Sequence, residues 1–167
     1  MSGRVLVPLD GSKLAARILD RVRPLARRGG YGLVLVSVLP EDASEEARRH
    51  LQQVQFALRR EGLDADYRVR TGDPASAILA LADDLQPTVI AMSTHGRTGP
   101  ARWVMGSVAE RVLRGSRHPV FLANPESLGG VPVGVGSRRI LVPLDGSERS
   151  AEVLACVAPF AADDSAG

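Results

Sequence analysis

Five short runs of apolar residues recur along the first 125 residues of the chain, and stretches with helical periodicity separate them. Four of the runs are rich in aliphatic side chains throughout, which is typical of strands buried on both faces of a parallel sheet. The third run alternates polar and apolar residues, as an edge strand does. The expected strands are residues 5–9, 33–39, 66–70, 89–92 and 119–123.

Between these runs, apolar side chains return every three or four residues, so each stretch is expected to form a helix with one buried face. Ser12 and Asp73 stand at N-cap positions, Pro74 stands at a first helical position, and glycines follow the first two helices. The expected helices are residues 13–28, 44–61, 74–86 and 104–113. This alternation predicts an α/β fold with an open parallel sheet, right-handed crossovers and helices on both faces.

The segment after the fourth expected strand is the most informative stretch for function. It reads Ser93-Thr94-His95-Gly96-Arg97-Thr98-Gly99, and Gly106-Ser107-Val108 follows where a helix starts. Glycines let the backbone approach a ligand closely, and free N–H groups at a helix N-terminus attract an anion. The order of strand, glycine loop and helix start favours a site for the phosphates of a nucleotide. The alternative is an ordinary turn that carries glycines, with Ser107 as the helix N-cap.

Asp10 ends the first expected strand. In open α/β sheets, ligands bind beyond the carboxyl ends of the strands, where the direction of winding reverses. If the first and fourth strands are neighbours at that point, Asp10 and the glycine loop face the same crevice. The alternative role of Asp10 is to cap the first helix or to shape the turn before it.

The composition argues against several classes of protein. Aromatic residues make up 4% of the chain and the formal charge is +2, so neither a base-stacking platform nor a nucleic-acid partner is indicated. No apolar run approaches the roughly 18 to 20 residues of a membrane span, and no signal peptide is visible. The single cysteine, Cys156, cannot form an internal disulfide, which fits a cytoplasmic protein, and it is expected to be a small core residue.

The chain contains an internal repeat. Residues 4–26 match residues 139–161 at thirteen of 23 positions, and both copies contain Leu-Val-Pro-Leu-Asp-Gly-Ser. The second copy is expected to form only a first strand and helix, which cannot bury their own apolar faces. One explanation is a tandem protein that has been cut short. The other is that the extra strand and helix pack on the first unit or on a partner chain.

The opening motif, present twice, and the glycine segment together closely resemble the universal stress protein family. The likeness divides the chain into a complete domain (1–125), a linker (126–137) and an incomplete second repeat (138–167). It implies a Rossmann-like five-stranded parallel sheet of order 3-2-1-4-5, akin to that of the adenine nucleotide alpha hydrolases. It also implies a homodimer formed through the last strand of the first domain.

The ATP-binding branch of that family carries Gly, two residues, Gly, nine residues, Gly and then Ser or Thr. Gly96, Gly106 and Ser107 match the last three elements, whereas Ser93 replaces the first glycine. The resemblance implies that Asp10 accepts hydrogen bonds from the nucleoside and that the backbone of Val38 meets the adenine edge. The cofactor implied is ATP with Mg²⁺ or Mn²⁺. The implied binding residues are Pro8, Leu9, Asp10, Val38, Ser93, His95, Gly96, Arg97, Gly99, Gly106, Ser107 and Val108.

Three functions follow from these observations. The first is a regulatory ATP-binding protein of the stress response, and the second is a slow ATPase or kinase-like enzyme. The chain has neither a Gly-x-x-x-x-Gly-Lys-Ser/Thr loop nor the kinase catalytic set, so no catalytic residue is expected and at most weak ATP hydrolysis. The third is a dimeric scaffold without nucleotide, which Ser93 in the first motif position keeps open. His95 and Arg97 could equally be solvated loop residues.

Overall fold

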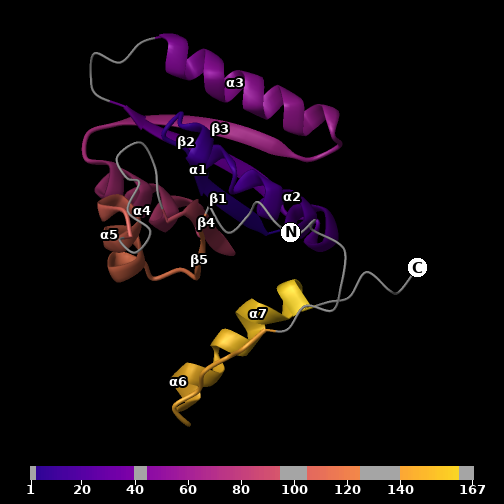
Figure 1. The fold of residues 1–167 in the computed structure, drawn as a ribbon, viewed down its shortest axis with the longest axis vertical. Coiled ribbons are helices and arrows are strands. Elements are labelled where there is room, and N and C mark those ends of the chain that lie inside the picture. The colour runs from indigo at the N-terminus through magenta and orange to yellow at the C-terminus, as the bar shows by residue number, and fades with distance from the viewer. Residues whose placement is uncertain (1–2, 40–44, 95–104, 125–139, 162–167) are drawn as a thin grey trace. The chain divides into compact units, whose positions relative to one another are not determined.

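In the computed structural model of the protein, residues 3–39, 45–94, 105–124 and 140–161 are described. The chain divides into two compact units, Met1–Gly130 and Val131–Gly167. The first unit contains the sheet and its covering helices (Figure 1). Each unit is described by itself below.

The first unit is built on one five-stranded sheet in which all neighbouring strands are parallel. The order is β3-β2-β1-β4-β5, so β1 is the central strand and the chain reverses its direction of travel between β1 and β4. This confirms the predicted fold class and strand order. The strands are β1 (Arg4–Pro8), β2 (Gly32–Leu39), β3 (Ala65–Thr71), β4 (Val89–Ser93) and β5 (Val120–Ala123).

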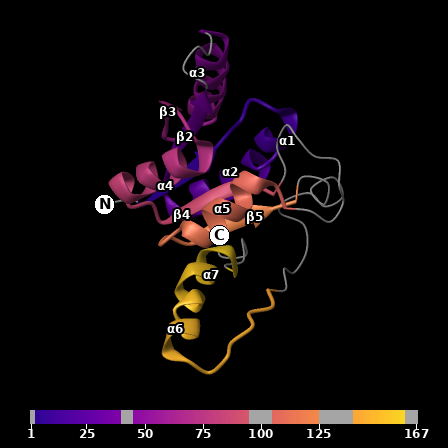
Figure 2. The ribbon, with the colours of Figure 1, turned by 90° about the vertical axis from the view of Figure 1, so that its left-hand side faces the viewer.

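Helices cover both faces of this sheet, as right-handed crossovers require. The crossovers between β1 and β3 place α1, α2 and α3 on one face, and the later ones place α4 and α5 on the other. The two later helices pack against each other (Figures 1 and 2). The helices are α1 (Lys13–Ala16), α2 (Leu19–Gly29), α3 (Glu45–Arg60), α4 (Pro74–Leu85) and α5 (Ser107–Gly115).

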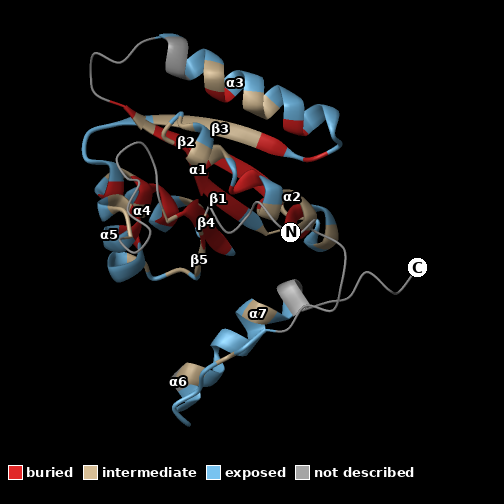
Figure 3. Cartoon of the chain, viewed as in Figure 1, coloured by how far each residue is buried: buried red, intermediate tan, exposed pale blue. Residues whose placement is uncertain are grey.

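The core lies along β1, β2 and β4, whose residues are almost all buried (Figure 3). On the face covered by α4 and α5, Leu6 and Ile90 of the sheet pack in one cluster with Ile78 and Val112 of the helices. Burying a large aliphatic side chain stabilises the fold by about 1.5–3 kcal/mol. The continuous apolar runs are therefore the main reason that these segments form central strands.

The first helix differs from its prediction because it is divided into α1 and α2. At the junction, the amides of Arg17, Ile18 and Asp20 donate to carbonyl oxygens three residues earlier, over 3.1–3.2 Å. Such bonds wind the backbone more tightly than an α-helix. Ile18 and Leu19 are both buried, so the apolar pattern continues across the junction and could not reveal it.

The second unit repeats the local structure of the segment that it matches in sequence. Ser147 caps α6 (Glu148–Ala151) by accepting from the amide of Ser150, as Ser12 caps α1 by accepting from Ala15. The preceding glycines also agree, with φ of +81° at Gly11 and +85° at Gly146. The unit continues as α7 (Val153–Ala161). The sequence predicted a first strand and a first helix for this unit. The helical part forms as α6 and α7, but residues 140–144 do not form a strand.

Most of the described apolar residues of the second unit are exposed, in contrast to their matches in the first. Leu6 is fully buried in β1, whereas its counterpart Leu141 is 93% exposed. Cys156 is also exposed on α7, so the prediction that it is a core residue was wrong. The helix carrying it forms, but a buried face needs a sheet on which to pack. The identification of this unit as the start of a second domain stays a prediction.

Candidate functional site

A pocket of about 340 Å³ lies at the carboxyl ends of β1, β2 and β4, next to the N-termini of α1, α4 and α5. This is the edge of the sheet where the strand order reverses, and it is where open α/β sheets bind ligands. Most of the wall is apolar, and a few hydroxyl and carboxylate groups are set into it. The lining residues are Pro8, Leu9, Asp10, Ala15, Val36, Val38, Leu39, Pro74, Ile78, Met92, Ser93, Thr94, Gly106, Ser107, Val108 and Ala109.

Eight of the expected site residues line this pocket, although they come from distant parts of the sequence. They are Pro8, Leu9, Asp10, Val38, Ser93, Gly106, Ser107 and Val108. The other four, His95, Gly96, Arg97 and Gly99, lie outside the described residues. The structure thus brings the end of β1 and the start of α5 to one hollow, as the reversal between β1 and β4 predicts.

Asp10 both shapes a turn and lines the pocket. Its Oδ1 accepts a hydrogen bond from the amide of Ser12 over 2.9 Å, and the hydroxyl of Ser12 accepts from Ala15 over 3.0 Å. Gly11, between Asp10 and Ser12, has φ +81°, a conformation that glycine adopts without strain. The turn role of Asp10 is therefore present, and Asp10 also lines the pocket, as the site hypothesis requires.

The backbone of β2 points toward the pocket at Val38. In a parallel ladder, alternate residues direct both their N–H and C=O groups toward the same neighbouring strand. Gly32 donates to Gly3 and Leu9 donates to Val36, so the even-numbered residues of β2 face β1. The β1–β2 pairing ends at Pro8 and Val36. Val38 comes two residues later, and its backbone groups are directed past the end of β1 at the pocket wall.

The start of α5 is held at the edge of the sheet by backbone hydrogen bonds. Gly106 donates to the carbonyl oxygen of Thr94 over 2.8 Å, and Thr94 donates to Ala123 over 2.9 Å. Gly106 is the N-cap of α5, so the prediction that Ser107 is the cap was wrong. Glycine has no side chain to accept from the first turn, and no described side chain caps the helix there. Helix N-termini in this state carry amides that attract anions.

Ser93 occupies the last position of β4 and is 7% exposed. Its side chain is therefore one of the few buried polar groups among the described residues, and it lines the pocket together with Thr94. A hydroxyl can donate one hydrogen bond and accept two, so both residues can meet polar groups of a ligand.

One wall of the pocket is formed by residues that no sequence motif marked. Pro74 and Ile78 belong to α4, which packs beside α5 on the same face of the sheet. Met92 precedes the glycine segment on β4 and adds to the apolar floor. The only sequence signal for the α4 wall was the strand order, since a helix that crosses from β3 to β4 passes over the reversal point.

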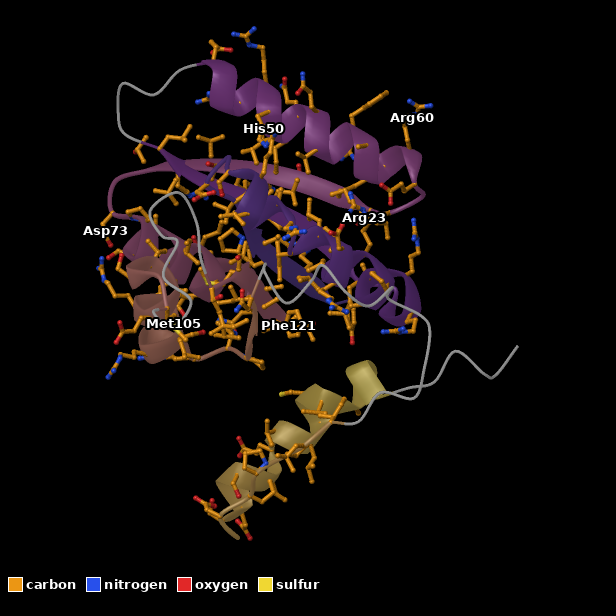
Figure 4. All side chains as sticks on the ribbon, in the orientation of Figure 1. Arg23, His50, Arg60, Asp73, Met105 and Phe121 are labelled. Atoms are coloured by element: carbon orange, nitrogen blue, oxygen red, sulfur yellow. The ribbon has the colours of Figure 1, made fainter. Side chains whose placement is uncertain are left out.

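Asp73 precedes the first turn of α4 (Figure 4) and pairs with Arg111 of α5 through two hydrogen bonds of 2.7 and 2.8 Å. Asp73 also accepts from the amide of Ser76 over 2.9 Å and so caps α4, as predicted. The hydrogen bonds from Arg111 hold the pKa of the Asp73 carboxyl well below its usual range. Within the described ranges, no three His, Cys, Asp or Glu residues gather into a group that could hold a metal ion.

A family model described as "Universal stress protein family" matches residues 40–124, about half of the chain. The chain belongs to the universal stress protein family. Among curated relatives, it is 27% identical over 136 residues to Universal stress protein MJ0531 of Methanocaldococcus jannaschii, covering 71% of this chain and 80% of that protein. It is 26% identical over 146 residues to Universal stress protein YxiE of Bacillus subtilis, covering 73% of this chain and 99% of that one.

Solved structures share the fold of the first unit. A universal stress protein in complex with cAMP aligns with a TM-score of 0.63 and 24% identity over 74% of this chain and 98% of that one. The universal stress protein from Archaeoglobus fulgidus in complex with dAMP aligns with a TM-score of 0.58 and 24% identity, over 73% and 97%. None of the helices in the described part of the chain combines the length and apolarity needed to cross a bilayer.

Proposed function

We propose that this universal stress protein is a regulatory protein that binds ATP in the pocket at the carboxyl ends of β1, β2 and β4. The observation that carries the proposal is the meeting of a largely apolar pocket with the uncapped N-terminus of α5. A volume of about 340 Å³ lies within the usual range of small-molecule sites. The fold neighbours whose complexes contain cAMP and dAMP support an adenine nucleotide as the ligand.

The base would lie against the apolar wall and the end of β2. Val36, Val38 and Ile78 contribute aliphatic surface, and the N–H and C=O groups of Val38 can pair with the donor and acceptor on one edge of adenine. Asp10, an acceptor when ionised, would bind the ribose hydroxyls. These contacts would orient the nucleoside with its 5′ end toward the start of α5.

The phosphates would lie in front of Gly106, Ser107 and Val108. The amides of the first helical turn donate to phosphate oxygens, and the helix dipole adds roughly 0.3–2 kcal/mol. His95, Gly96, Arg97 and Gly99 complete the phosphate loop in this proposal. A divalent ion, Mg²⁺ or Mn²⁺, would enter with the phosphates and neutralise part of their charge.

A homodimer through β5 is part of the same proposal. β5 is an edge strand that pairs only with β4 in the described sheet, and its apolar residues Val120, Phe121 and Leu122 are half-buried. An edge of this kind is a template for pairing with a second copy.

Calorimetric titration of the purified protein with ATP, with and without Mg²⁺, tests the proposal. We expect a dissociation constant below about 0.1 mM. Nucleotide released on denaturation and identified by its ultraviolet spectrum would give independent support. Binding that is absent at millimolar ATP would favour the second candidate, a dimeric scaffold without nucleotide. The observation that favours the scaffold is Ser93, which stands where the ATP-binding branch carries its first glycine.

A further inference from the structure

Asp73 and Arg111 form an ion pair next to the pocket. Nη1 and Nη2 of Arg111 donate to Oδ1 and Oδ2 of Asp73 over 2.7 and 2.8 Å, so the pair is bidentate. Both side chains are about half exposed. The pKa of Asp73 is lowered and that of Arg111 is raised, because each hydrogen-bonds to the other in its charged form. Both groups therefore stay charged at neutral pH.

The pair lies next to residues that line the pocket. Asp73 directly precedes Pro74, which lines the pocket at the start of α4. Arg111 lies one helical turn after Val108, which lines the pocket at the start of α5. Arg114 and Glu110 form a second ion pair, but both residues belong to α5, so this pair does not join α5 to α4.

Resting on the proposed function, we propose that the Asp73–Arg111 pair sets how the pocket discriminates nucleotides by charge, because Arg111 neutralises a carboxylate that would otherwise repel the phosphates. While the pair is intact, the two charges largely cancel in the field at the pocket mouth. Without the Arg111 cation, the Asp73 carboxylate repels the phosphates. Without the Asp73 charge, the Arg111 cation attracts them. The two single substitutions must therefore change the affinity for phosphorylated ligands in opposite directions.

A purely structural bridge between α4 and α5 makes a different prediction. Loss of either partner would then weaken ligand binding, and the loss of affinity would not depend on the charge of the ligand. Asp73→Asn is the informative substitution, because asparagine retains the N-cap acceptor for Ser76 while it removes the charge. Arg111→Gln removes the cation from the partner.

The experiment is calorimetric titration of the full chain with adenosine, AMP and ATP at two salt concentrations. Arg111→Gln is expected to weaken ATP binding about three- to tenfold, and Asp73→Asn to strengthen it by a similar factor at low salt, with smaller effects for AMP. The affinity for adenosine, which carries no phosphate charge, should stay the same in both variants. The matched controls are Arg114→Gln and Asp84→Asn, which make the same charge changes at exposed positions farther along α5 and α4.

The outcomes separate this inference from the function on which it rests. Weaker binding of both ATP and adenosine in both variants would overturn the inference and identify the pair as a structural bridge. Equal changes in the variants and their controls would overturn it as well. In either case, binding of ATP by the unaltered protein would leave the proposed function standing. An unaltered protein that binds none of the three ligands contradicts the proposed function, and this inference with it.

Discussion

The amide of Gly106 donates to the carbonyl oxygen of Thr94, and this 2.8 Å bond joins the end of β4 to the start of α5 at the pocket. Gly106 has φ −59° and ψ 142°, values that any L-residue can adopt. The backbone conformation therefore does not require glycine at this position. A side chain here would instead change the space in front of the first amides of α5, and substitutions at Gly106 therefore give two tests of the phosphate site.

Gly106→Val should abolish ATP binding while the protein still unfolds cooperatively. The valine side chain would occupy the space in which a phosphate approaches the amides of Ser107 and Val108, whereas the backbone need not move. Titration calorimetry measures the loss of binding, and denaturant unfolding serves as the control for folding. Full affinity in this variant would mean that the phosphates lie elsewhere.

Gly106→Ser should stabilise the protein and weaken ATP binding at the same time. A serine N-cap accepts from the first turn of a helix and is better than glycine by a few tenths of a kcal/mol. The same hydroxyl would take an amide that the phosphate needs. Chemical denaturation and ATP titration of one preparation measure both quantities. Unchanged affinity together with a gain in stability would mean that the amides of α5 do not bind phosphate.

Asp10→Asn and Asp10→Ala separate the two roles of Asp10. Asparagine can still accept from the amide of Ser12, so the turn should survive, but the neutral amide is a weaker acceptor for ribose hydroxyls than the carboxylate. Alanine loses both functions and should cost about 0.5–1.5 kcal/mol of unfolding free energy. We expect reduced ATP affinity in both variants and reduced stability only in Asp10→Ala. Unchanged affinity in the asparagine variant would leave Asp10 with its turn role alone.

Leu6→Ala and Leu141→Ala compare equivalent positions of the two repeats. Leu6 is fully buried in β1, and truncation of a buried leucine costs about 2–5 kcal/mol. Leu141 is 93% exposed, so its truncation should change the unfolding free energy by less than about 0.5 kcal/mol. Urea denaturation of both variants measures the difference. A large destabilisation in Leu141→Ala would show that the second unit buries this residue against a partner.

The Asp73–Arg111 pair should contribute to acid sensitivity. The pKa of Asp73 in the folded protein lies well below its usual value of 3.8, so its stabilising contribution is present above pH 3.8. That contribution is lost as the pH falls below 3.8 toward the folded-state pKa. Asp73→Asn should consequently reduce stability at pH 7 and have a smaller effect near pH 3. Urea denaturation at the two pH values checks this, and an effect that grows on acidification would contradict it.

The strands could be predicted because their information is largely local, whereas their order came from the family resemblance. Each central strand is a continuous apolar run, and the alternation of strands and helices leaves few topologies once crossovers are right-handed. The turns around Gly11 and Gly146 were likewise predictable, since a cap and a glycine suffice to form them. They have nearly the same φ although their surroundings differ.

What the sequence could not show depends on packing between distant segments. The wall formed by Pro74 and Ile78 exists because α4 crosses to β4, and no motif marks it. Cys156 lies on a helix as expected, but its burial depended on a sheet, and the described residues of the second unit form none. The exchange of Ser107 for Gly106 as the N-cap of α5 is a shift of one residue, within the usual uncertainty of helix ends.

A crystal structure of the protein grown with ATP and Mg²⁺ is the most direct test of the central claim. The account predicts density for adenine beside the backbone of Val38 and for phosphates in front of Gly106, Ser107 and Val108. Density for the nucleotide at another surface, or an empty pocket at saturating ATP, would contradict it.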